Sequence, residues 1–177
     1  MTDFDAAERD YLDEFGDIDT AIELVKGLNA ELDEPADEEE AIRLLRRRFA
    51  TDQAVRDVRT GCMTLLMLFG AMFDEPPLDF VPAAIRKLGK IREIPEDVLP
   101  MIAGGMTAAF LRMSPNQWRD ALGPVSNVET MSWVYATWTL VNYIDHCKEE
   151  KGAAFRQLDE TMRRVFDTIA LEDHERF

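Results

Sequence analysis

The sequence is poor in the residue types that hold most metal and redox sites in proteins. Of its 177 residues, only two are cysteines and two are histidines. Cys62 and Cys147 are too few for a disulfide framework, and their spacing does not match a Cys-x-x-Cys pair. Neither His146 nor His174 has a glutamate three residues before it, so the Glu-x-x-His motif of di-iron helical bundles is absent. We therefore expect no metal site and no cofactor.

Catalytic motifs are also lacking. The sequence has no glycine-rich phosphate loop and no Gly-x-Ser-x-Gly nucleophile motif. Asp145, His146 and Cys147 are consecutive, and neighbouring residues on a helix point about 100° apart, so these side chains cannot converge on one substrate. Glu129 and Asp120 are isolated acids, and nothing in the sequence marks a partner for them. We expect that the protein is not an enzyme.

No apolar stretch is long enough to span a membrane. The longest, Cys62–Phe73, has 12 residues and is interrupted by Thr64 and Gly70, whereas a membrane-spanning helix needs about 20 residues. The N-terminal residues Met1–Asp5 have neither the basic nor the apolar region of a signal peptide. These features predict a cytoplasmic protein that does not associate with membranes.

Basic residues are almost absent from the first 40 residues, which we call the acidic arm. This stretch contains 16 acidic residues and only two basic ones, Arg9 and Lys26, so it carries −14 of the chain's net charge of −15. The rest of the chain is nearly neutral. A charge of this sign repels nucleic acids and anionic membranes and attracts basic surfaces. We therefore expect a protein partner with a basic surface, and no nucleic-acid or membrane ligand.

Helical periodicity is present in nearly every segment. Apolar residues recur at steps of three and four, and no segment shows the alternation or the turn dipeptides of a β-hairpin. We predict an all-α fold, a single-domain helical bundle of about eight to nine helices over residues 1–177. Residues 1–34 are expected to form an acidic helical hairpin, and residues 37–171 a near-neutral helical body. The expected helices cover residues 4–15, 18–32, 37–48, 52–73, 80–91, 96–112, 115–122, 127–150 and 153–170.

Local signals mark several of these helix ends. Gly16 is expected to stop the first helix, and Thr51 and Ser114 are N-cap residues. Ser126–Glu129 matches the capping box Ser-x-x-Glu, which places the start of the next helix there. Gly104 and Gly105 are adjacent, and we expect them to kink the helix that contains them.

The helix predicted over residues 127–150 is apolar on all sides. Such a helix is either surrounded by other helices or shared with a second subunit or a ligand. The stretch Cys62–Phe73 adds more apolar surface. Together the two segments predict a homodimer.

The main functional hypothesis is a non-catalytic interaction or regulatory protein whose acidic arm contacts a basic partner. In this hypothesis the hairpin faces the partner and lies outside the core, onto which it docks through apolar stripes that include Tyr11, Phe15 and Val25. The partner-binding residues expected on its outer face are Asp10, Asp13, Glu23 and Glu31. The alternative is an arm that only keeps the protein soluble and monomeric.

A basic cluster follows the arm. It consists of Arg43, Arg46, Arg47, Arg48, Arg56 and Arg59. These side chains suit either a nucleic-acid contact or pairing with the acidic residues 33–40, and the neighbouring arm favours the second interpretation.

A second functional hypothesis comes from a different class, a small-molecule sensor. Its apolar pocket would be lined by Met131, Trp133, Tyr135 and Trp138, together with other methionines of the chain. Filling of the helical core is the simpler role for the same side chains.

Overall fold

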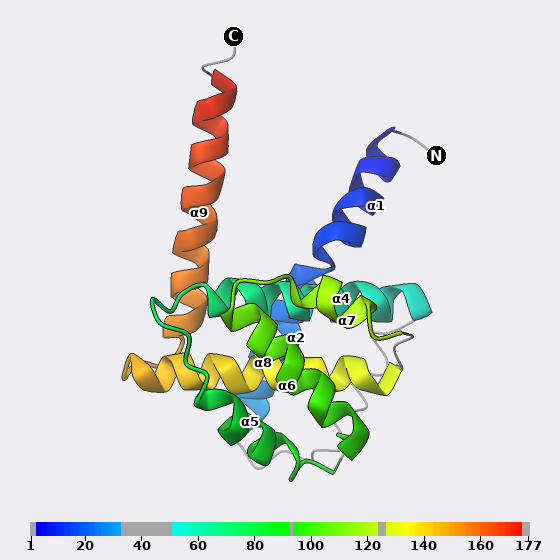
Figure 1. Cartoon of the computed structure of the whole chain (residues 1–177). Helices are drawn as coiled ribbons and strands as arrows, with labels where there is room; N and C mark the ends of the chain where they lie inside the picture. The colour runs from blue at the N-terminus through cyan, green and yellow to red at the C-terminus, as the bar shows by residue number, and fades with distance from the viewer. Residues whose placement is uncertain (1–2, 33–50, 93, 124–126, 175–177) are drawn as a thin grey trace. The chain divides into compact units, whose positions relative to one another are not determined.

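The computed structural model describes residues 3–32, 51–92, 94–123 and 127–174, and helices joined by short connections make up most of these ranges (Figure 1). The elements are α1 (Asp3–Phe15), α2 (Ile18–Leu32), α4 (Asp52–Gly70), α5 (Phe80–Leu88), the 3₁₀-helix η1 (Glu96–Val98), α6 (Leu99–Phe110), α7 (Pro115–Asp120), α8 (Asn127–Cys147) and α9 (Ala153–His174). The described residues contain no β-strand, so the predicted all-α class is confirmed. The helix expected over residues 37–48 lies outside the described residues.

The chain divides into two compact units, Met1–Leu140 and Val141–Phe177. Helix α8 begins in the first unit and ends in the second. We describe each unit by itself.

Helix α4 is the element around which the first unit is built. It packs against α1, α2, α6 and α7. Its completely buried side chains are Cys62, Met63, Leu65, Leu66 and Phe69. Burying one such side chain stabilises a fold by about 1.5–3 kcal/mol. The apolar surface expected to support a homodimer at this stretch is therefore core, and that basis for a dimer is lost.

Helix α2 also belongs to the core. Ala21 and Val25 are completely buried, and Leu24 and Leu28 are at most 5% exposed. These residues recur at three- and four-residue steps, so they form one face, and α2 packs against α4. The prediction that the whole acidic hairpin lies outside the core is therefore wrong for α2.

The part of α8 in the first unit is buried nearly all round. The described side chains from Glu129 to Leu140 are buried or half-buried, and Trp133, Val134 and Leu140 are completely buried. The Thr137 hydroxyl donates to the Cys62 carbonyl at 3.4 Å, which ties α8 to α4. Of the two interpretations of this apolar helix, the structure supports burial in the bundle.

The two adjacent glycines lie within α6, which runs without a break from Leu99 to Phe110, and a kink there stays a prediction. They make room for two indole rings. A Cβ at Gly104 would lie 2.1 Å from Trp118 Cζ2, and a Cβ at Gly105 would lie 2.3 Å from Trp133 Cη2. Any side chain at either position would overlap an aromatic ring.

The predicted helix starts at two N-caps are confirmed. The Thr51 hydroxyl accepts from the Ala54 amide at 3.1 Å, and the Ser114 hydroxyl accepts from the Gln117 amide at 3.3 Å. The helix expected over residues 96–112 is divided into η1 and α6, and Pro100 lies in the first turn of α6.

In the second unit, Asp145 organises the turn between α8 and α9. Its carboxylate accepts from the Gly152 amide at 2.7 Å and from the Ala154 amide at 2.8 Å. Gly152 has a φ of +81°, a conformation that favours glycine. The side chain therefore satisfies two backbone donors at the start of α9, which the helix itself leaves without partners.

Candidate functional site

Helix α1 carries the exposed face that most resembles a binding surface in the first unit. It projects from α4 (Figure 1). Tyr11 is 49% exposed and Phe15 is 37% exposed. The two residues are one helical turn apart, and their ring centroids lie 5.2 Å from each other. Docking of these aromatic residues on the body was expected from the sequence, and the structure shows them exposed instead.

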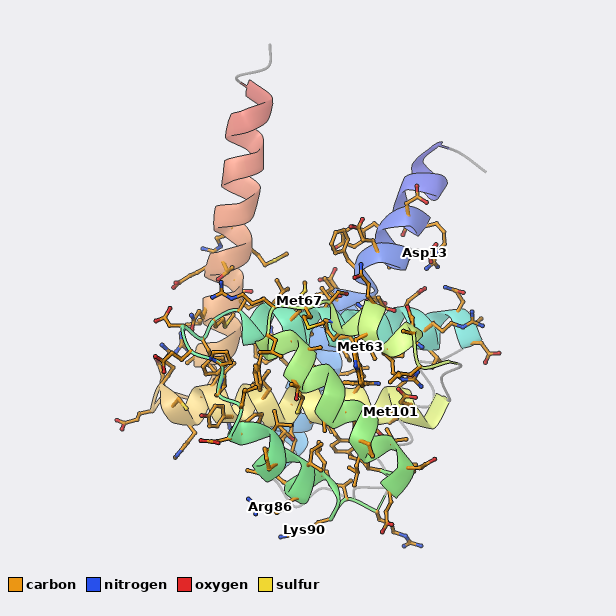
Figure 2. All side chains as sticks on the ribbon, in the orientation of Figure 1. Asp13, Met63, Met67, Arg86, Lys90 and Met101 are labelled. Carbon is orange, nitrogen blue, oxygen red and sulfur yellow. The ribbon has the colours of Figure 1, made fainter. Side chains whose placement is uncertain are left out.

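Carboxylates flank this aromatic pair. Glu8, Asp10 and Glu14 are exposed on α1, as is Asp13, which Figure 2 labels. The surface therefore combines apolar rings with negative charge. We call these side chains (Glu8, Asp10, Tyr11, Glu14 and Phe15) the α1 face.

A clamp of charged side chains holds α1 on α4. The Arg9 guanidinium donates to both carboxylate oxygens of Asp57 at 2.7 and 3.0 Å, and to Asp13 at 2.6 Å. The Gln53 amide donates to Asp57 at 3.0 Å. Hydrogen bonds to Asp57, and then to Asp13, raise the pKa of Arg9 above its usual range. The guanidinium therefore stays charged, and the clamp persists across physiological pH.

A close backbone crossing fixes the end of α1. Gly16 has a φ of +75°, and a Cβ on it would lie 2.1 Å from the Gly61 backbone nitrogen. Next to it, the Asp17 amide donates to the Asp57 carbonyl at 2.8 Å. The Thr64 hydroxyl donates to the Phe15 carbonyl at 2.8 Å. The end of α1 is thus joined to α4 by backbone contact and hydrogen bonds.

The structure places the predicted partner-binding residues in different settings. Asp10 and Glu23 are exposed on α1 and α2, respectively. Asp13 is exposed but already paired with Arg9. The side chain of Glu31 lies outside the described residues. Partner binding by these four residues stays a prediction.

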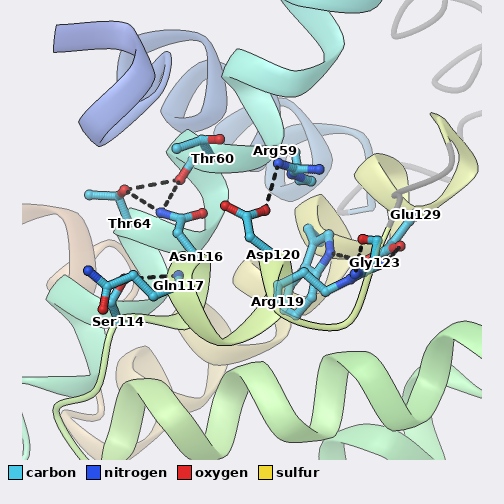
Figure 3. A network of polar contacts seen from close by, with 11 residues as sticks. Arg59, Thr60, Thr64, Ser114, Asn116, Gln117, Arg119, Asp120, Gly123 and Glu129 are labelled. Atoms are coloured by element: carbon cyan, nitrogen blue, oxygen red, sulfur yellow. Dashed lines mark hydrogen bonds and ion pairs between the residues drawn. The ribbon is translucent and has the colours of Figure 1, made fainter. Parts of the chain in front are cut away.

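A second polar region lies between α4, α7 and the start of α8 (Figure 3). Arg119 and Glu129 form a two-pronged ion pair with distances of 2.5 and 2.7 Å, and each side chain is 4% exposed. Arg119 also donates to the Gly123 carbonyl, and the Trp133 indole donates to Glu129 at 3.1 Å. The hydrogen bonds to Glu129 raise the pKa of Arg119. Glu129 was expected to close a capping box with Ser126, which lies outside the described residues, and the structure shows Glu129 in this buried pair.

The same region links α4 to α7. Arg59 lies 3.5 Å from Asp120, and burial lowers the pKa of its guanidinium. The Asn116 amide donates to the Thr60 carbonyl and the Thr64 hydroxyl, at 3.5 and 3.4 Å. Both acids that looked isolated in the sequence, Glu129 and Asp120, therefore pair with arginines. Pairing explains their positions without a catalytic role.

Most of the basic cluster falls outside the described residues, which include only Arg56 and Arg59. Arg59 pairs with Asp120 of α7, and the expected pairing with residues 33–40 involves residues that lie outside the described ranges. Arg56 is exposed.

The residues of the alternative pocket occupy different environments. Trp133 is completely buried against Gly105, and Tyr135 is 4% exposed. Met131 and Trp138 are half-buried, and the Lys87 ammonium lies 4.4 Å from the centroid of the Trp138 ring. Trp133 thus fills the core, and a pocket formed by these four residues stays a prediction.

Two kinds of feature are absent from the described part of the chain. It contains no group of three or more His, Cys, Asp or Glu side chains that could hold a metal ion. None of its helices combines the length and apolar character needed to cross a membrane.

Comparison with known proteins finds no similar protein. No family model matches the chain, and no curated protein or solved structure is significantly similar to it.

Proposed function

We propose that this protein acts through binding rather than catalysis, and that the α1 face contacts a basic surface on a partner protein. The observation that supports this most directly is the exposure of Tyr11 and Phe15, at 49% and 37%, among carboxylates on a helix that Arg9 ties to Asp57 of α4. An exposed aromatic pair ringed by charge is typical of a protein-binding surface.

The two components of the α1 face would contribute differently. Carboxylates steer a basic partner toward the face and raise the association rate. Aromatic side chains supply apolar contact area in the centre of an interface and slow dissociation. The clamp between Arg9 and Asp57 reduces the cost of ordering the helix on binding, because its position is set beforehand.

Only part of the acidic arm serves this function. The apolar residues of α2 are used in the core, which leaves α1 as the hairpin helix with exposed aromatic residues among those described. The proposed surface therefore includes Asp10 but shifts its centre to Tyr11 and Phe15. Asp13 acts through Arg9, as part of the clamp.

A binding experiment with a defined probe tests the proposal. The probe is a helical amphipathic peptide of leucine and lysine, and its affinity for the full chain is measured by fluorescence anisotropy. The triple variant E8Q/D10N/E14Q should weaken binding about tenfold and reduce its salt dependence. The matched control is D74N/E75Q/D79N, which removes the same charge from three exposed residues elsewhere and should change affinity little.

The aromatic component has its own control. The variant Y11A/F15A should accelerate dissociation and leave the salt dependence unchanged. The control L111A/M113A removes apolar side chains of similar exposure, 50% and 54%, from another place in the first unit. The α1 face is not the binding surface if Y11A/F15A binds the peptide as its control L111A/M113A does. The same conclusion holds if E8Q/D10N/E14Q binds it as D74N/E75Q/D79N does.

A further inference from the structure

Positive charge gathers at the end of α5. Arg86 and Lys87 lie in its last turn, and Lys90 and Arg92 follow within four residues of its end. All four side chains are exposed. We call them the basic patch. No acidic residue lies between Phe80 and Arg92, so the described side chains of the patch carry four positive charges; Glu93, directly after Arg92, lies outside the described residues.

Neighbouring elements do not neutralise the basic patch. Helix α5 packs against α6, whose sequence LPMIAGGMTAAF contains no charged residue. Glu96 and Asp97 belong to η1, and within the described part of the chain neither forms an ion pair with the patch. Lys87 is held over the Trp138 ring at 4.4 Å. The patch is thus a surface of one sign of charge on a packed helix.

The acidic α1 face of the same chain cannot reach this patch. Figure 2 labels Asp13 on α1 and Arg86 and Lys90 near α5, and these labels lie at opposite ends of the first unit. The clamp on Asp57 and the crossing at Gly61 hold α1 on α4. Contact between the two surfaces therefore requires two copies of the chain.

We infer that the basic patch is a docking surface for the α1 face of a second copy of this chain. This inference rests on the proposed binding role of that face and names its partner. The charges are complementary, because Asp10 and Glu14 lie one helical turn apart on α1, and Arg86 in the last turn of α5 is followed by Lys90 just beyond the helix end. An arginine of the patch could also lie over the exposed Tyr11 ring, which attracts cations through its π face.

The overall negative charge of both copies does not prevent this contact at physiological salt. Charges more than about 8 Å apart are largely screened there, so the opposite charges at the contact outweigh the net repulsion. The interface joins two different surfaces, so a pair of copies joined by one such contact leaves one patch and one α1 face free. A reciprocal two-fold dimer uses both free surfaces at once, whereas one-sided docking continues into longer chains or a larger ring.

Mass measurement on the full chain tests the inference. Sedimentation over a range of micromolar concentrations should show masses that rise above the 20.2 kDa of one chain at about 0.15 M salt and return to it at about 1 M. The patch variant R86Q/K90Q and the face variant D10N/E14Q should each raise the dissociation constant about tenfold. The control K148Q/R163Q removes two exposed positive charges from the second unit and should associate like the wild type.

Mixing the two variants gives the sharpest result. The patch variant keeps its α1 face, and the face variant keeps its patch, so an equimolar mixture should form one-to-one pairs and nothing larger. Association of the patch variant alone at wild-type strength would overturn the inference. So would a wild-type chain that stays at one-chain mass.

The outcomes also separate this inference from the proposed function. A wild-type monomer whose α1 face still binds the leucine–lysine peptide would overturn the second-copy partner and leave the proposed function standing. A wild-type monomer whose patch binds a short DNA duplex, with loss of binding in R86Q/K90Q, would assign the patch to nucleic acid and also overturn the inference.

Discussion

Glycine at position 16 sets how α1 and α2 cross α4. Its positive φ and the 2.1 Å approach to Gly61 leave no space for a side chain. The variant G16A should lower the free energy of unfolding by at least about 2 kcal/mol, because strain and backbone overlap add. The matched control is G27A in α2, where a Cβ would meet nothing within 4 Å. That control should stabilise the protein by up to about 1 kcal/mol. Urea unfolding of both variants measures the difference, and equal effects would show that the crossing is looser than described.

The buried ion pair makes a second prediction for single residues. The variant E129Q leaves the Arg119 charge buried without its partner and should cost about 3–5 kcal/mol of stability. Replacing both residues with apolar ones, as in R119M/E129L, should cost less than E129Q alone. The exposed pair of Arg156 and Glu150 provides the control, and R156Q should change stability by less than about 1 kcal/mol. A double variant less stable than E129Q would show that the pair stabilises the fold beyond its desolvation cost.

The two cysteines should differ sharply in reactivity. Burial raises the pKa of the Cys62 thiol from 9.0 to about 12, whereas Cys147 is exposed. Because the thiolate is the reactive form, an alkylating reagent at neutral pH should modify Cys147 in the native protein and Cys62 only after unfolding. The unfolded state ionises Cys62 at lower pH than the folded state, so this residue should reduce stability as pH rises from about 9 to about 12. Mass spectrometry of the C147S variant checks the prediction, and rapid alkylation there would contradict it.

At the scale of elements, one carboxylate determines how α9 begins. Asp145 accepts two backbone amide hydrogen bonds, so D145A should cost about 0.5–2 kcal/mol, the usual value of an N-terminal cap. Hydrogen exchange of the Gly152 and Ala154 amides should become faster in this variant. The control D159A changes an exposed residue of α9 and should leave those amides protected. Unchanged protection in D145A would mean that the turn holds without the side chain.

Helix positions were predictable where a local signal reports them. Thr51, Ser114 and Gly16 marked helix ends correctly, because capping and a positive φ depend on a few neighbouring residues. The ends of α5 and α6 were placed less well, since the packing of a helix decides where its last turn ends.

Contacts between elements could not be predicted in the same way. Periodicity shows that α1 and α2 each have an apolar stripe, but it does not show that Val25 is buried while Tyr11 stays exposed. The partner of Glu129 is ten residues away on another helix, and a capping-box motif cannot report it. The paired glycines of α6 similarly gave no sign in the sequence of their neighbours, Trp118 and Trp133, because the fold brings those rings to them.

For the molecule as a whole, the distribution of charge within the first unit affects stability and binding more than the net charge does. The α1 face is acidic, the basic patch is positive, and the core between them is apolar. Ion pairs such as Arg9 with Asp57 use some of the charge inside the fold, while Glu8, Asp10 and Glu14 remain exposed on one short helix. Concentrated like charge of this kind opposes the folded state at low salt and favours a basic partner.

Stability should therefore depend on salt through the α1 face. Raising the ionic strength from about 0.01 M to about 0.15 M shortens the screening length from about 30 to about 8 Å, so the unfolding free energy of the wild type should rise. Each like-charged pair one turn apart costs only about 0.2–0.5 kcal/mol, so a total gain of about 1 kcal/mol is expected.

The variant E8Q/D10N/E14Q should be as stable as the wild type or more stable, with a smaller salt effect. It leaves Asp13 intact because that carboxylate pairs with Arg9. The control D74N/E75Q/D79N should keep most of the salt effect, since its charges lie outside the arm. If the α1 variant instead unfolds more easily at every salt concentration, its carboxylates are structural, and a binding role for them loses its physical basis.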